Sequence, residues 1–159
     1  MKEEYFMKKA IAVAKQGVDR GQSPFGAVII KNGKQKATIV AACHNVVWKN
    51  CDATAHAEVT AISQACKKLH SIDLSNCTIY STTEPCPMCF SAIHWARIAK
   101  IVYGASIEDA EKAGFNELHV HDIVLKKLGK DKVKIKTGVL KRENVALFQY
   151  WMKKHGKVY

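Results

Sequence analysis

Four residues in two short segments carry the side chains that a catalytic metal site needs. His56 and Glu58 are separated by one residue, and Cys86 and Cys89 form a Cys-x-x-Cys pair. One imidazole and two thiolates are three ligands for zinc, and three protein ligands leave the fourth tetrahedral position open to water, as catalytic sites do. Zinc lowers the pKa of that water to about 7. We therefore expect one Zn²⁺ per chain, held by His56, Cys86 and Cys89, with Glu58 as a free carboxylate beside it.

Both segments resemble the starts of helices. Thr54 suits the N-cap of a helix, and Pro87 suits the first helical position. Inside a helix, His56 and Glu58 would point to nearly opposite faces, but at a first turn both can reach a ligand beyond the helix end. Two helix N-termini would then converge on one metal, where their positive ends favour thiolate and hydroxide.

The Cys-x-x-Cys pair alone has two plainer interpretations. It is also typical of a redox pair, or of half of a four-ligand structural zinc finger. A finger needs a fourth ligand at short spacing, and the sequence offers no convincing one. The catalytic interpretation is therefore favoured.

The composition predicts one globular domain spanning residues 1–159. Hydrophobic residues make up 48% and charged residues 25%, as in ordinary globular proteins. The sequence contains no run of about 18 apolar residues, so no membrane span is predicted. Cys43, Cys66 and Cys77 lie in apolar patterns typical of small buried side chains rather than a disulfide framework. We expect a cytoplasmic, reducing environment.

The positive charge is concentrated near the C-terminus. The whole chain has a formal charge of +11, and residues 126–159 hold eleven Lys or Arg against two acids. Such a patch attracts nucleic acid. The alternative is a solvated lysine surface, and we favour it because few aromatic residues stand nearby for base stacking.

Apolar periodicity predicts helices and strands in alternation along most of the chain. Alternation of this kind favours parallel pairing of the central strands, with the metal near strand ends where loops open a crevice. The predicted helices cover 4–18, 56–69, 87–97, 117–128 and 143–154, and the predicted strands cover 27–30, 37–44, 77–81, 100–104 and 133–137, with a hairpin turn at 31–34 and a loop at 45–53.

The metal motifs also carry a family resemblance. His56-Ala57-Glu58 and Pro85-Cys86-Pro87-Met88-Cys89 match the His-x-Glu and Pro-Cys-x-x-Cys signature of zinc-dependent nucleobase deaminases. The chain therefore resembles that superfamily. The resemblance implies an α/β fold of the cytidine-deaminase-like type, a three-layer α/β/α arrangement with a mixed sheet of about five strands.

The residues around the motifs resemble the bacterial guanine deaminase family in particular. They are Pro24-Phe25-Gly26-Ala27, Asn45, the run 52–62, Trp95-Ala96-Arg97, Ala113-Gly114-Phe115-Asn116-Glu117, Phe148-Gln149-Tyr150-Trp151 and Tyr159. This likeness implies that guanine, a small purine base, is hydrolysed to xanthine and ammonia. Glu58 would move a proton from water to the ring nitrogen, a step typically worth about 10²- to 10⁴-fold in rate.

The same resemblance implies a set of substrate contacts. The backbone N–H of Ala57 would orient the substrate, Asn45 would bond the base, and Phe25 and Trp95 would pack around it. Plainer roles exist for each side chain: Phe25 and Trp95 as core or interface aromatics, and Asn45 as a turn cap.

The likeness also gives roles to later residues. Glu117 stands where the family carries an Asp that contacts the base edge, and Asn116 replaces a second acid. Glu143 would reach the substrate, and the C-terminal segment with Tyr159 would cross to a partner subunit, so that a swapped homodimer is expected. The plainer roles are a helix N-terminal acid for Glu117 and a frayed end for Tyr159.

Other functions remain open alternatives. Glu84 to Cys89 and Ile101 to Ala105 also resemble tRNA adenosine deaminases, but the Gly-rich segment that follows the strand in that family is absent. Cytosine deaminase is another enzymatic alternative. A zinc-stabilised RNA-binding module without catalysis is disfavoured by Glu58, since a structural zinc needs no acid there. Nucleic acid is an expected partner only under the tRNA alternative.

Overall fold

A computed structural model describes residues 2–159. Its core is a five-stranded mixed sheet in the order β2-β1-β3-β4-β5. β1 pairs antiparallel with both β2 and β3, whereas β3–β4 and β4–β5 are parallel. The strands are β1 Gly26–Lys31, β2 Thr38–His44, β3 Cys77–Thr83, β4 Lys100–Ala105 and β5 Lys134–Lys136.

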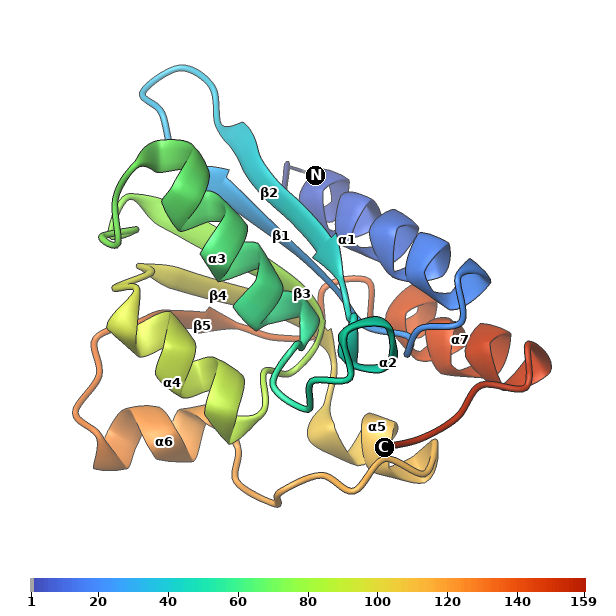
Figure 1. Cartoon of the computed structure of the whole chain (residues 1–159). Coiled ribbons are helices and arrows are strands. Elements are labelled where there is room, and N and C mark those ends of the chain that lie inside the picture. The colour runs from blue at the N-terminus through green and yellow to red at the C-terminus, as the bar shows by residue number, and fades with distance from the viewer. Residues whose placement is uncertain (1) are drawn as a thin grey trace.

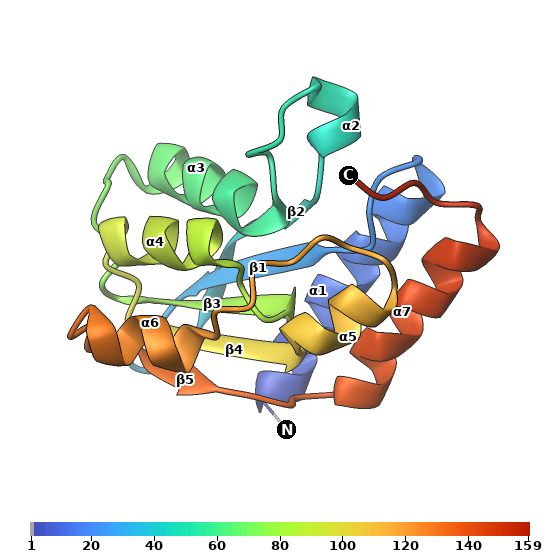
Figure 2. The ribbon, with the colours of Figure 1, turned by 90° about the horizontal axis from the view of Figure 1, so that it is seen from below.

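Helices cover both faces of the sheet, as Figures 1 and 2 show. α1 and α7 pack on one face, and α3, α4 and α6 on the other. This is the expected three-layer α/β/α arrangement of the cytidine-deaminase-like fold. The helices are α1 Lys2–Asp19, α2 Val47–Asn50, α3 Ala57–Leu69, α4 Pro87–Trp95, α5 Ile107–Lys112, α6 Asp122–Leu128 and α7 Lys141–Lys153.

Separate apolar clusters join the sheet to its two helix layers. Ala61, Ile79 and Ile93 belong to the cluster beneath α3 and α4, while Met7 and Val102 belong to the one beneath α1. All five side chains are at most 1% exposed. α3 and α4 are therefore fixed side by side on one sheet face, with their N-termini at the same edge (Figure 1).

The predicted elements need several corrections. The loop predicted at 45–53 contains the single-turn helix α2, and α5 was not predicted. The helix predicted at 117–128 begins only at Asp122, and residues 113–121 are irregular. The hairpin turn is longer than expected, because the chain leaves β1 at Lys31 and enters β2 at Thr38.

No helix within residues 2–159 combines the length and the apolar character that crossing a membrane requires.

Candidate metal centre and cavity

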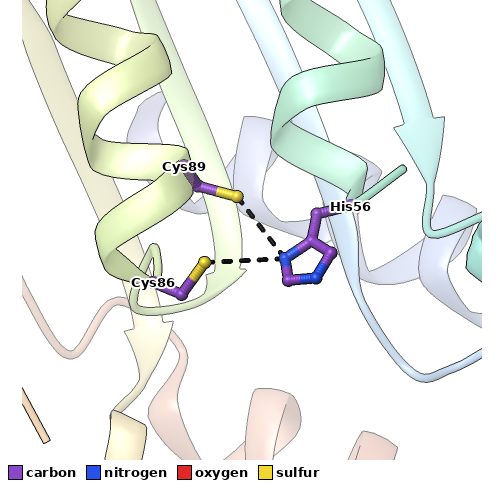
Figure 3. A group of neighbouring side chains, drawn as sticks. All are labelled: His56, Cys86 and Cys89. Carbon is purple, nitrogen blue, oxygen red and sulfur yellow. Dashed lines mark hydrogen bonds between the residues drawn. The ribbon is translucent and has the colours of Figure 1, made fainter. Parts of the chain in front are cut away.

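The three expected zinc ligands meet where α3 and α4 begin. His56 is the N-cap residue of α3, and Cys86 is the N-cap residue of α4. Thr54 is therefore not the N-cap; its side chain and backbone bond Asp52 instead, two residues before it. Pro87 occupies the start of α4, as predicted. Both ligand-bearing helix ends point at one place (Figure 3).

The donor atoms have the spacing of a tetrahedral zinc site. His56 Nδ1 lies 3.6 Å from the sulfur of Cys86 and 3.6 Å from that of Cys89. One ligand atom from each residue lies within 4.8 Å of the other two. Zinc bonds of about 2.3 Å to sulfur and 2.0–2.1 Å to nitrogen separate the two atoms by about 3.6 Å in a tetrahedron. The donor set and its spacing therefore fit zinc.

Without a metal, the two thiols have pKa values shifted in opposite directions: the hydrogen bond to Cys86 and burial raise the pKa of Cys89, whereas that of Cys86 is lowered. A hydrogen bond from Cys89 lowers the pKa of Cys86 to about 4, against the opposing effect of burial. The two helix N-termini add positive potential at the same point. Cys86 is therefore a thiolate at neutral pH, the form that coordinates a metal.

Glu58 lies beside the ligands and is buried, with 6% of its surface exposed. Its Oε2 is 3.5 Å from Cys89 Sγ. Burial raises the pKa of Glu58, and the charge of Cys86 adds to the effect. A raised pKa makes a carboxylate a stronger base, which suits a group that must take up a proton.

Ser81 of β3 is a site residue that the sequence did not reveal. Its hydroxyl lies 2.9 Å from Glu58 Oε1 and 2.6 Å from the carbonyl oxygen of Thr83. With one proton, Ser81 donates to only one of these oxygens at a time. When Glu58 is protonated it can donate to Ser81, which then donates to Thr83; when Glu58 is ionised, Ser81 can turn its proton to the carboxylate. Ser81 therefore supports both protonation states.

A small cavity opens beside these groups. Its empty volume is about 300 Å³, with open solvent at the mouth included. Glu117 and Tyr159 line it, and both also line a groove on its outer side. The residues that line the cavity are Phe25, His56, Glu58, Thr83, Glu84, Cys86, Glu117 and Tyr159.

Glu117 is a second carboxyl group at the cavity with a raised pKa. Burial raises its pKa to about 7, and the charges of Cys86 and Glu58 contribute further. Phe25 is held by edge-to-face contacts with Phe115 and Phe148, at ring-centroid distances of 4.8 and 5.9 Å. Ala57 is fully buried as the first residue of α3, where a backbone N–H has no partner within the helix.

The C-terminal tail closes the site of its own chain. The Tyr159 ring lies 5.6 Å from the His56 ring and 5.8 Å from that of Phe115. Asn45 donates from Nδ2 to the Tyr159 hydroxyl at 2.8 Å, and its Oδ1 accepts from the backbone N–H of Val47. Asn45 is thus engaged at both ends of its amide, and it forms the turn that was its plainer role.

Two expected site residues lie elsewhere. Trp95 is 80% exposed at the far end of α4, about 9 Å along the helix axis from Cys89. Glu143 is exposed in the first turn of α7, across the sheet from α3 and α4. Neither lines the cavity, because helix geometry carries each of them away from it.

A second group of potential ligands lies behind the cavity. Glu84, Glu108 and His121 offer ligand atoms within 4.8 Å of one another. Both ring nitrogens of His121 already pair with carboxylates, Nδ1 with Glu84 and Nε2 with Glu108. This group is an internally paired ion cluster.

Comparisons with known proteins agree with the geometry. Residues 1–105 match the family model of the cytidine and deoxycytidylate deaminase zinc-binding region. Guanine deaminase of Bacillus subtilis is 46% identical over 122 residues, 76% of this chain and 76% of that protein. The tRNA-specific adenosine deaminase of Aquifex aeolicus is 42% identical over 105 residues, 66% of this chain and 67% of that protein.

A solved structure extends the likeness to the later part of the chain. A protein crystallised in complex with 2,6-diaminopurine has a TM-score of 0.87 and 28% identity, and the match covers 99% of this chain and 85% of that one. Its fold therefore matches the C-terminal part as well as the metal segments.

Proposed function

Because the chain belongs to the cytidine and deoxycytidylate deaminase zinc-binding family, we propose that it is a hydrolytic deaminase of a purine base, guanine, which it converts to xanthine and ammonia. The observation that carries the proposal is the convergence of His56, Cys86 and Cys89 with the buried carboxyl group of Glu58 beside one cavity. Zinc held there supplies a Lewis acid that lowers the pKa of bound water to about 7.

The chain's own residues move the protons. Glu58 takes a proton at Oε2, the oxygen on the ligand side, and delivers it to a nitrogen of the base. Ser81 steadies Oε1 in both states, because its hydroxyl can act as donor or as acceptor. Burial raises the pKa of Glu58, which favours the protonated form that can donate to the substrate.

Guanine is favoured by the cavity and by the relatives. The carboxyl group of Glu117 faces the cavity and can accept from the N–H groups on the edge of a purine. The docked tail with Tyr159 covers the site, which suits a free base better than a polynucleotide. The relative from Bacillus subtilis is a guanine deaminase, and the similar solved structure holds the purine base 2,6-diaminopurine.

The proposal is tested by metal analysis and ammonia release. Purified protein should hold about one zinc per chain and release ammonia from guanine, but not from cytosine. Glu58→Gln should keep its zinc and lose about 10²- to 10⁴-fold in rate, since the proton carrier is gone. Glu4→Gln, an exposed change on α1, is the control. Undiminished turnover by Glu58→Gln would refute the proton-transfer role.

A tRNA adenosine deaminase is the second candidate, supported by the relative from Aquifex aeolicus and by the basic residues 126–159. Arg97, Lys130, Lys132 and Lys134 line a groove near the start of β4, whereas the site lies near its end. An RNA stem-loop seated in the site would have to span that strand to reach the groove. Ammonia released from an anticodon stem-loop but not from guanine would favour this candidate.

The oligomeric state is part of the proposal. We propose a homodimer in which the tail of each subunit can close the partner's cavity in place of its own. Mixing an inactive Glu58→Gln chain with a tail-deleted chain tests the exchange, because recovered activity requires a tail supplied across subunits.

A further inference from the structure

Glu84 lies between β3 and the ligand Cys86 and lines the cavity, and its carboxylate oxygens bond residues outside the metal site. The side chain is 1% exposed. It accepts hydrogen bonds from the backbone N–H of Ile107 at 3.3 Å and of Asp122 at 3.0 Å. It also lies 3.2 Å from His121 Nδ1. Every one of these partners belongs to α5 or to the start of α6.

These contacts fix the two ends of the stretch 107–122, which consists of α5, the irregular segment 113–121 and the first residue of α6. Residues 113–121 connect α5 to α6, and Ile107 and Asp122 are the first residues of those two helices. His121 completes the link, because its Nε2 pairs with Glu108 Oε1 of α5 at 2.8 Å. The buried carboxylate of Glu84 therefore holds the start of α5 and the start of α6 together.

The segment supplies part of the cavity wall. Glu117 lines the cavity, and Phe115 packs against Tyr159 and Phe25. Asn116 and Leu118, on either side of Glu117, are exposed. The place of Glu117 consequently depends on how firmly the two ends of the segment are held.

Several titratable groups surround Glu84. Hydrogen bonding with Glu84 raises the pKa of His121, which favours the imidazolium. Asp122 is fully buried, and burial raises its pKa to about 9, so that it is neutral at pH 7. Tyr103, Glu117, Glu58 and Cys86 are further titratable groups whose charges couple to this cluster.

We propose that Glu84 is a positioning residue that acts through the segment 113–121, setting where Glu117 meets the substrate and hence which base binds. The proposal rests on the deaminase function proposed above. In this proposal, residues 84–89 have two roles. Cys86 and Cys89 hold the metal, and Glu84 holds the segment 113–121, which faces the substrate.

The test begins with Glu84→Gln, which keeps the size of the side chain and removes its charge. Zinc content should stay at about one per chain. Amide hydrogen exchange should accelerate about 10- to 100-fold across 113–121 and remain unchanged in α3 and α4, since charged hydrogen bonds at the base of the segment are lost. With guanine, KM should rise about tenfold while kcat changes less than about threefold.

Asp131→Asn is the matched control. Asp131 also accepts a backbone N–H, from Val133, and pairs with a histidine, His94, but it lies at the other end of the sheet. This change should alter neither KM nor exchange in 113–121. If Glu84→Gln does not fold, His121→Gln, at a half-exposed position, should give the same pattern in weaker form.

A double-mutant cycle shows whether the effect passes through Glu117. Glu84→Gln should add little to the KM change already caused by Glu117→Gln, because the wall then no longer presents that carboxylate. Additive effects, loss of zinc, or unchanged exchange in 113–121 would overturn the proposal. The exchange measurement needs no substrate, so it tests Glu84 even if the protein does not deaminate guanine.

Discussion

Asp122→Asn should stabilise the protein, and by more as the pH rises. Asp122 is fully buried, and neither carboxylate oxygen has a hydrogen-bond partner among residues 2–159. Burial raises its pKa from 3.8 to about 9, and the charges of Glu84 and Glu58 add to the rise. Between those values the folded protein holds a proton that the unfolded chain has released. Stability therefore falls as the pH increases through this window.

The size of the effect follows from the width of the window. Each pH unit between the unfolded and folded pKa values costs about 1.4 kcal/mol. From about pH 5 to pH 8 the wild-type protein should thus lose about 4 kcal/mol relative to Asp122→Asn. The asparagine amide has a similar shape and a similar lack of partners, but it never ionises.

Urea unfolding of both proteins at several pH values measures the difference. The zinc ligands are the same in both, so the pH dependence of metal binding cancels. Asp131→Asn provides a control of opposite sign: burial raises the pKa of Asp131, but the Val133 N–H and His94 outweigh it and lower the pKa. That stabilisation is present above the unfolded pKa and lost as the pH falls, so Asp131→Asn should be less stable than wild type near neutrality. Parallel curves for wild type and Asp122→Asn from pH 5 to 8 would show that burial does not hold Asp122 neutral.

Three further changes test the site and its support. Cys89→Ser should weaken zinc binding by more than the roughly 10- to 100-fold that loss of an outer partner costs, and competition with a chelator measures this; retention equal to wild type would exclude Cys89 as a ligand. Gly104→Ala would place a Cβ 2.0 Å from Nδ2 of Asn144, so we expect a loss of about 1–3 kcal/mol in urea unfolding, and an unchanged midpoint would be the contrary result. Tyr159→Phe removes the acceptor for Asn45 and should speed carboxypeptidase removal of the tail about 2- to 10-fold, whereas an equal rate would mean that this bond does not dock the tail.

Local patterns were sufficient to predict the metal centre. Cys86, Pro87 and Cys89 lie close together in the sequence. The start of a helix can be predicted from a few neighbouring residues, here from Pro87 at the first turn of α4. The N-cap of α3 was placed two residues early because Thr54 has the right side chain, yet that side chain bonds Asp52. The helices and strands followed from apolar periodicity, which reflects burial directly, whereas the three-layer arrangement was implied by the family resemblance.

Residues whose role depends on distant partners escaped prediction. Ser81 contacts Glu58, which is 23 residues away in the sequence. Because β3 is buried along its whole length, no alternation of buried and exposed residues distinguishes Ser81. Glu84 reaches Ile107 and Asp122, which adjoin it only after folding. α5 was missed because it has only six residues, although the capping box at Ser106 signals its start.

The reacting groups and two of the residues that shape the cavity occupy different stretches of the chain. His56, Glu58, Cys86 and Cys89 fall within residues 1–105, where the family match lies, whereas Glu117 and Tyr159 come later. Relatives named for different substrates match this chain over 122 and 105 residues. Divergence of the later stretch can therefore retune selectivity during evolution while the hydrolytic machinery is inherited intact, and an engineer seeking a new specificity would diversify 113–121 and the tail first.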